Sequence, residues 1–179
     1  MEENYSSMVS EVEVAPDLDL SQEDLNEILK GYLEAAIWTE EERLKEDYDS
    51  EYGYNEDEYN EDDEEETELD KLIRIQTQFN SKPIESFVVE DLEGDSKVQA
   101  YIDIKTFIKN AGKDAVEEAI QDQGLFRLGM DIWLTRNGHG SGFFDHSYEH
   151  EKELMDAGQN LKSVDLYITD NLTLAFSNA

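Results

Sequence analysis

Three histidines and an abundance of carboxylates are the side chains of this chain whose types could do chemistry. His146, Glu149 and His150 have the H-x-x-E-H spacing of one class of zinc protease. On a helix, histidines four residues apart share a face, which suits zinc. A functional zinc site also needs a third ligand and a buried, open position, and so short a pattern often arises by chance. We therefore expect exposed histidines at the polar start of a helix, with no cofactor and no bound metal.

An acidic stretch approximates the spacing of a calcium-binding loop through Asp47, Asp49, Glu51, Asn55 and Glu58. The sixth position of such a loop turns sharply and is normally glycine. Tyr52 occupies that position here, and Gly53 comes one place late. Because any acidic run produces near-matches of this kind, we expect weak, diffuse binding of divalent cations and no dedicated calcium site.

The segment 132–145 is the most distinctive part of the chain, because glycines and polar residues lie between aromatic residues. Glycines allow positive φ angles or a close approach to a ligand. One interpretation is a binding loop for an anion or a protein, in which Arg136, Asn137 and His139 make the contacts. The other is a glycine-rich hairpin whose aromatic side chains pack into the core. The residue types favour the second interpretation.

This segment, IWLTRNGHGSGFFD, resembles the FWLTRNGHGAGFWD signature of a widespread family of small, mostly uncharacterised phage proteins. Residues 31–38 are similar to the N-terminal helix of that family, and residues 164–168 to its C-terminal strand. The chain departs from the family in its long acidic segment at 40–70, and at His146, where a basic residue is expected. The resemblance implies phage origin and a compact α+β unit, and it implies no enzyme activity.

The composition of the chain is extremely acidic, with 46 acidic and 14 basic residues and a net charge of -32. Solubility needs a net charge of only roughly 2–8 in magnitude, so we expect the negative field to be used. The chain has no cysteine, which excludes disulfides and fits a reducing compartment. No apolar run approaches the roughly 20 residues that span a bilayer. Anionic membranes and nucleic acids would repel this chain, so we expect a basic protein partner in the host cytoplasm.

Half of this charge lies in residues 40–70, which contain 18 acidic and 2 basic residues. One interpretation is a disordered acidic insertion, because blocks of like charge repel and do not pack. The other is a binding element in which tyrosines supply contact area and carboxylates supply charge. On that second interpretation, the residues that contact a partner are Tyr54, Asp57, Glu58, Tyr59, Glu61, Asp62, Asp63, Glu64, Glu65 and Glu66.

The charge also suggests a function. Duplex DNA carries one charge per roughly 1.7 Å, so about 40 Å of DNA holds about 24 charges. A compact domain of this length is about 40 Å across. We therefore predict a phage-encoded, non-enzymatic DNA mimic that occludes the basic groove of a host nuclease, restriction or other defence enzyme, polymerase or nucleoid protein. The alternative is a binding module that uses the glycine-rich hairpin around Arg136–His139; both monomers and dimers are compatible with the sequence.

The elements that would position these residues follow from hydrophobic spacing and turn signals. A helix begins at Ser21, where Asp24 completes a variant of the capping box, and runs to about Trp38 or into 43–45. The other predicted helices cover about 69–79, 98–112, 116–124 and 147–160, and a short strand covers 84–89. Two strand pairs are predicted, with 130–135 and 142–145 flanking Asn137-Gly138, and 164–169 and 172–176 flanking Asp170-Asn171.

These elements predict an α+β fold with a helical N-terminal part and a small antiparallel sheet of C-terminal hairpins with an intervening helix. We expect residues 1–20 to form an acidic N-terminal arm. Residues 21–179 would then form a single α+β domain, with the acidic insertion at about 40–70.

Overall fold

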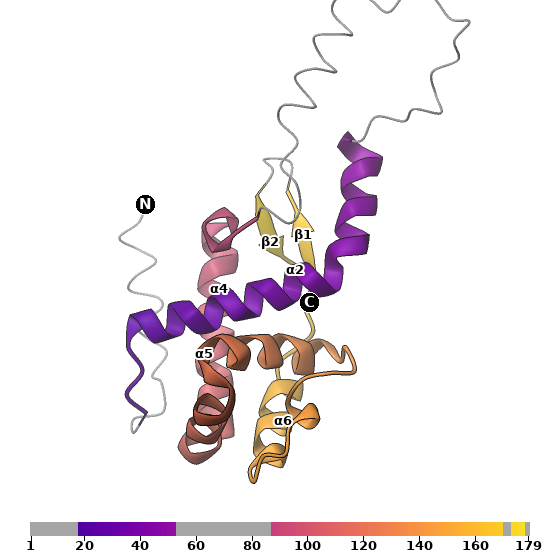
Figure 1. The fold of residues 1–179 in the computed structure, drawn as a ribbon. Coiled ribbons are helices and arrows are strands. Elements are labelled where there is room, and N and C mark those ends of the chain that lie inside the picture. Colours follow the sequence, from indigo (N-terminus) through magenta and orange to yellow (C-terminus); the bar gives the residue numbers. More distant parts are fainter. Residues whose placement is uncertain (1–17, 53–86, 170–172, 178–179) are drawn as a thin grey trace, which may run out of the picture.

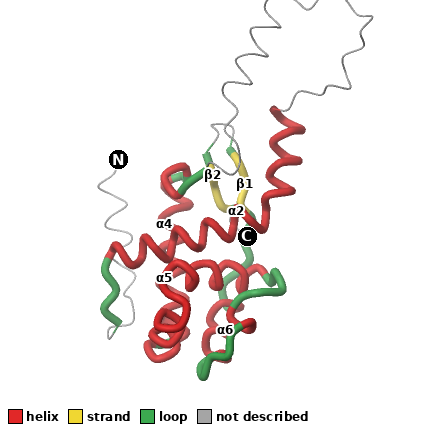
Figure 2. Tube along the Cα trace, in the orientation of Figure 1, coloured by secondary structure: helices red, strands yellow, loops and turns green. Residues whose placement is uncertain are grey.

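A computed structural model of the chain describes residues 18–52, 87–169 and 173–177, in which helices predominate (Figures 1 and 2). The helices are α2 (Gln22–Tyr52), α4 (Gly94–Ala111), α5 (Lys113–Asn137) and α6 (Glu151–Gln159). Two short 3-10 helices, η3 (Val89–Asp91) and η4 (Phe143–Asp145), and the strands β1 (Leu166–Ile168) and β2 (Leu174–Phe176) complete the described chain. This architecture confirms the predicted α+β class.

Helix α2 begins at the capping box that the sequence predicts. The Ser21 N–H donates to Asp24 Oδ2 at 2.8 Å, and the Asp24 N–H donates to Ser21 Oγ at 3.2 Å. These bonds satisfy two donors at the helix start, and the bond from the Ser21 hydroxyl lowers the pKa of the Asp24 carboxyl. The helix continues to Tyr52. Residues 40–52, the first part of the predicted acidic insertion, therefore belong to α2.

The backbones of α2 and α5 cross so closely that only glycine fits at the crossing. A Cβ at Gly31 would lie 1.8 Å from the carbonyl oxygen of Phe126, and a Cβ at Gly129 would lie 1.9 Å from that of Ile28. Figure 1 shows the second half of α5 running alongside α2. Two glycines, one on each helix, thus set the separation of the two helices.

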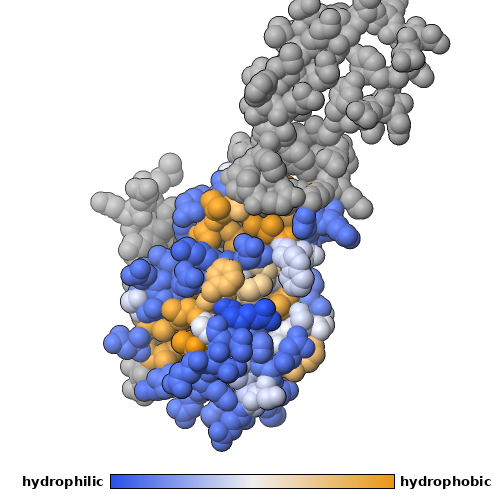
Figure 3. Space-filling model, in the orientation of Figure 1, coloured by the Kyte–Doolittle hydropathy of each residue, from blue (hydrophilic) through white to orange (hydrophobic). Residues whose placement is uncertain are grey.

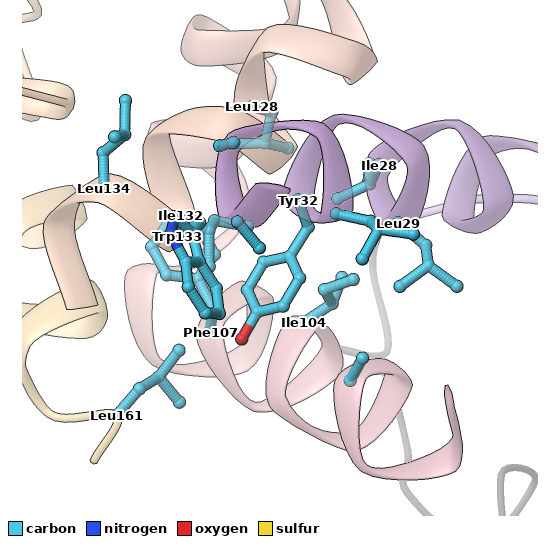
Figure 4. Close-up of a cluster of buried hydrophobic side chains, with 14 of the residues drawn as sticks. Ile28, Leu29, Tyr32, Ile104, Phe107, Leu128, Ile132, Trp133, Leu134 and Leu161 are labelled. Atoms are coloured by element: carbon cyan, nitrogen blue, oxygen red, sulfur yellow. The ribbon is translucent and has the colours of Figure 1, made fainter. Parts of the chain in front are cut away.

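An aromatic cluster occupies the core between α2, α4 and α5 (Figure 4). The rings of Tyr32 and Trp133 meet edge to face with centroids 5.1 Å apart, and the Phe107 ring stacks on Phe143 at 5.3 Å. The indole N–H of Trp133 donates to Thr39 Oγ1 at 2.9 Å, and the Thr39 hydroxyl donates to the Ala35 carbonyl. Side-chain bonds of this second type often bend helices, and Figure 1 shows that α2 bends.

The predicted hairpin around Asn137-Gly138 is wrong. Residues 130–135 are the buried last turns of α5, and residues 143–145 form η4. Gly138 has φ 68° and ends the helix in the left-handed conformation. An Asn-Gly dipeptide is as suitable for ending a helix in this way as it is for forming a hairpin turn. Helix α5 is broken earlier at Gly124, with φ 83°, where the sequence predicts that a helix ends. A second helical segment follows directly after Gly124. The strand prediction for 130–135 failed because a helix that is buried on nearly all sides lacks a clear apolar stripe.

The C-terminal strand pair is confirmed in a shorter form. β1 and β2 are antiparallel, with Leu166 opposite Phe176, and their connecting turn lies outside the described residues. The strand predicted at 84–89 is not formed in its described part, where η3 begins at Val89. Helix α4 confirms the helix predicted over 98–112, and α6 starts later than predicted, at Glu151. The helix predicted over 69–79 and residues 1–17 of the arm lie outside the described residues, whereas Leu18 packs against the core.

Candidate functional site

The structure does not describe the acidic residues that the sequence analysis predicts to contact a partner. The set Tyr54, Asp57, Glu58, Tyr59, Glu61, Asp62, Asp63, Glu64, Glu65 and Glu66 lies outside the described residues. The described residues nevertheless hold 28 of the 46 acidic residues and 11 of the 14 basic ones. The folded domain is therefore strongly acidic without the segment 53–86. Figure 3 shows hydrophilic surface over much of one face, with smaller hydrophobic areas between.

Arg136, the cation of the proposed binding loop, is buried and faces the protein interior. Its Nη1 donates to Asp103 Oδ2 at 2.7 Å and to the Tyr32 hydroxyl. Its Nε and Nη2 both donate to the carbonyl of Lys162, the former at 3.0 Å. These bonds join α5 to α2, to α4 and to the segment that follows α6. The structure therefore assigns Arg136 a scaffolding position, and the expectation that it contacts a ligand is not supported.

The two other residues of that loop have different environments. Asn137 Oδ1 accepts the N–H of Val164 at 3.1 Å, so its carbonyl also has a structural partner. His139 is exposed, its ring stacks on Trp133 with centroids 6.5 Å apart, and its Nε2 lies 3.8 Å from Glu40 Oε1. Of the three candidate loop residues, only His139 is exposed.

A buried carboxylate, Asp131, forms the centre of a charge cluster that the sequence analysis missed. Asp131 Oδ1 lies 3.0 Å from Arg127 Nε, and its Oδ2 lies 3.3 Å from His146 Nε2. Burial raises the pKa of the Asp131 carboxyl, and the neighbouring guanidinium of Arg127 opposes that rise. His146 thus supplies a partner for a buried acid. The four-residue spacing of Arg127 and Asp131 is the only local signal that could have revealed the pair.

The two histidines of the H-x-x-E-H pattern are held by different carboxylates of α5, and they do not share a helix face. His150 Nδ1 lies 2.9 Å from Glu118 Oε2, and Glu118 also accepts the N–H groups of Glu149 and His150 at 2.6 and 3.0 Å. The hydrogen bond with Glu118 raises the pKa of His150. The prediction of two exposed histidines on a helix start is wrong, since α6 begins after both and His146 is largely covered. In the described residues, no group of three His, Asp or Glu side chains is placed to hold a metal ion.

The calcium-like spacing has no loop to support it in the described chain. Residues 47, 49 and 51 are in the last turns of α2, where the backbone is helical. A calcium loop needs a sharply turning backbone that brings alternate side chains to one centre. Asn55 and Glu58 lie outside the described residues.

The first half of α5 carries a row of carboxylates that borders a surface groove of about 490 Å³. The acidic side chains of the row are Asp114, Glu117, Glu118 and Asp122, and Tyr148 and Ser147 form the opposite side. Asp114 and Asp122 are eight positions apart, which is a rise of about 12 Å, and the mean rise between successive carboxylates of the row is about 4 Å. That value is close to the roughly 3.4 Å per phosphate along the axis of one DNA strand. Lys113 lies near one end of the row, 3.7 Å from Glu117.

No protein family, curated protein or solved structure matches this chain at a significant level. Within the described residues, no helix combines the length and apolar character that crossing a membrane requires.

Proposed function

We propose that this protein is a phage-encoded, non-enzymatic inhibitor that binds the basic DNA-binding groove of a host protein and blocks it as a DNA mimic. The observation that carries the proposal is the excess of acid on the folded domain itself, 28 acidic against 11 basic residues in the described part. An excess of this size is costly to a compact domain, because like charges repel, and solubility does not require it.

The placement of the basic residues supports the proposal, because several of them are buried or paired with a neighbouring acid. Arg136 and Arg127 lie against Asp103 and Asp131, and Lys105 is buried. Three exposed lysines pair with acids one helical turn away, namely Lys30 with Glu27, Lys113 with Glu117 and Lys152 with Asp156. The described surface that a partner meets consequently carries far more carboxylates than basic side chains.

The acidic row of α5 is the described surface best suited to a groove built for phosphates. The mean rise between its carboxylates, about 4 Å along the helix axis, is close to that between the phosphates of one strand. A carboxylate accepts the same bidentate hydrogen bonds from arginine as a phosphate, and it offers no strand to cleave. The negative field would also speed association with a basic partner and make binding sensitive to salt. The segment 53–66 would add further charge to this interaction.

The test is capture of host proteins on the immobilised full chain at low salt, followed by elution with increasing salt. We expect recovery of a DNA-binding protein that duplex DNA displaces in competition. Neutralising the α5 row with Asp114→Asn, Glu117→Gln and Asp122→Asn should lower the salt concentration at which the partner elutes. Deleting residues 53–66 should do the same.

A matched control removes the same charge from scattered exposed sites, through Glu23→Gln, Glu42→Gln and Asp165→Asn. This control should elute close to the unmodified protein if the arrangement of charge matters. If both variants elute at an equally lowered salt concentration, the row contributes only through its total charge. A captured protein that duplex DNA does not displace would contradict the proposal.

A further inference from the structure

A second groove, of about 260 Å³, lies between α2, the segment 87–90 and the start of the second half of α5. Its interior is apolar, with Leu33 and Ile37 from α2 and Phe126 from α5. The remaining lining residues are Lys30, Glu34, Phe87, Val88, Val89 and Glu90. The groove is therefore an apolar hollow with charged residues at its edge.

Large apolar side chains are exposed at this groove. Phe126 is 38% exposed and Val88 is 52% exposed. Trp38, which is 60% exposed, extends the same surface of α2, because residues 30, 34 and 38 are each four apart and share a helix face. Exposed aromatic clusters beside a pocket are typical of protein-binding surfaces, in which a few aromatic residues supply most of the binding energy.

The edge of the groove has a net negative charge. Glu34 and Glu90 lie on it without a basic neighbour of their own among the described ion pairs, and Lys30 is 3.3 Å from Glu27. An occupant with basic residues beside an apolar one would meet complementary charge at the edge and apolar surface inside. An acidic or a purely apolar occupant would lose one of these two contributions.

We propose that this groove docks an apolar side chain of the same basic partner, flanked there by lysine or arginine, that Phe126 is the anchor in the groove, and that Trp38, which lies beyond the lining residues, extends the contact along α2. This inference rests on the proposed function and adds a second contact to it. Electrostatic complementarity mainly increases the association rate and the specificity. A buried apolar anchor slows dissociation, since affinity differences between related complexes arise largely from differences in the dissociation rate. The protein would thus use its carboxylates to attract the partner and this groove to retain it.

The inference can be tested with two synthetic peptides that carry the same lysines. One is an amphipathic leucine–lysine helix, and the other has serine at every leucine position. The chain has two tryptophans, and Trp133 is fully buried, so a change in emission on binding reports on Trp38. We expect the leucine peptide to bind about tenfold more tightly than the serine peptide at high salt, and to shift the emission to shorter wavelength.

The Phe126→Ser variant should lose the tenfold difference in affinity between the two peptides. If Phe126→Ser does not fold, the affinities of Trp38→Ser for the two peptides, measured by calorimetry, should show the same loss. The matched control is Phe144→Ser, because Phe144 is 46% exposed on η4 and does not line the groove. Equal affinity of the unmodified protein for the two peptides would overturn the inference, as would equal loss in the control. In either case, salt-dependent binding of the serine peptide would still support the proposed binding of a basic partner through carboxylates. If the serine peptide did not bind at all, even at low salt, that proposed function would be contradicted.

Discussion

The two halves of α5, on either side of Gly124, use the same charged residue types for opposite purposes. The first half places carboxylates on the surface, in the row of Asp114, Glu117, Glu118 and Asp122, of which Glu118 also holds the start of α6. The second half buries its charges, with Asp131 against Arg127 and Arg136 against Asp103. A charge at the surface contributes to the field around the molecule, whereas a buried charge must be paired and holds elements together. The comparison shows that the protein's acidity has two components, only one of which is available to a partner.

The largest effect should come from breaking the buried side of this comparison. Replacement of Arg136 by alanine leaves Asp103 and the Tyr32 hydroxyl without their donor, and should cost about 3–5 kcal/mol of unfolding free energy. Chemical denaturation monitored by circular dichroism measures this loss. Replacement of the exposed Lys109 by alanine, with the same change in charge, should be nearly neutral. A small effect of Arg136→Ala would show that the buried network is not what holds the second half of α5.

The next effect concerns the close crossing that fixes the second half of α5 against α2. Gly129→Ala places a methyl group 1.9 Å from the Ile28 carbonyl oxygen, which forces the helices apart. We expect a loss of about 1–3 kcal/mol, the usual range for overpacking. The same measurement on Gln159→Ala, an exposed position at the end of α6, provides the control. Unchanged stability in Gly129→Ala would mean that the two backbones are further apart than described.

The surface side of the comparison predicts a smaller change of opposite sign. Glu118 and Asp122 are like charges four residues apart on one helix, and such pairs are destabilising by about 0.2–0.5 kcal/mol. Asp122→Asn should therefore raise the unfolding free energy by about that amount while weakening partner capture. The gain should shrink at high salt, because exposed charges are screened. A loss of stability in this variant would show that the row is structural.

The smallest predicted effect is the pH dependence at the contact between the first half of α5 and α6. The hydrogen bond with Glu118 raises the pKa of His150 in the folded protein, so the folded state binds its proton more tightly than the unfolded state. Its contribution to stability is full below the unfolded pKa near 6.5 and is lost as the pH rises through the folded value. Titration of His150 by NMR should show the raised pKa, and Glu118→Gln should lower it. An unchanged pKa in that variant would contradict the assignment.

The sequence predicted the local features of α2, α4 and the strand pair but not the second half of α5. The Ser21–Asp24 capping box is a contact over three residues, so its signal lies entirely in the local sequence. The Asn137-Gly138 dipeptide is compatible with both a hairpin turn and a helix end, and local chemistry does not separate the two. The choice depends on whether residues 128–136 are surrounded by α2 and α6, which is a property of the whole fold.

The sequence by itself determined the negative field, the absence of cysteine and the helix start at Ser21, because these depend on composition or on neighbouring residues. Only the tertiary structure decided which charges reach the surface. The glycine-rich segment makes Arg136 one candidate ligand contact, yet its partners Tyr32, Asp103 and Lys162 come from distant parts of the chain. A buried charge needs partners that long-range packing brings together, and residue spacing cannot reveal them.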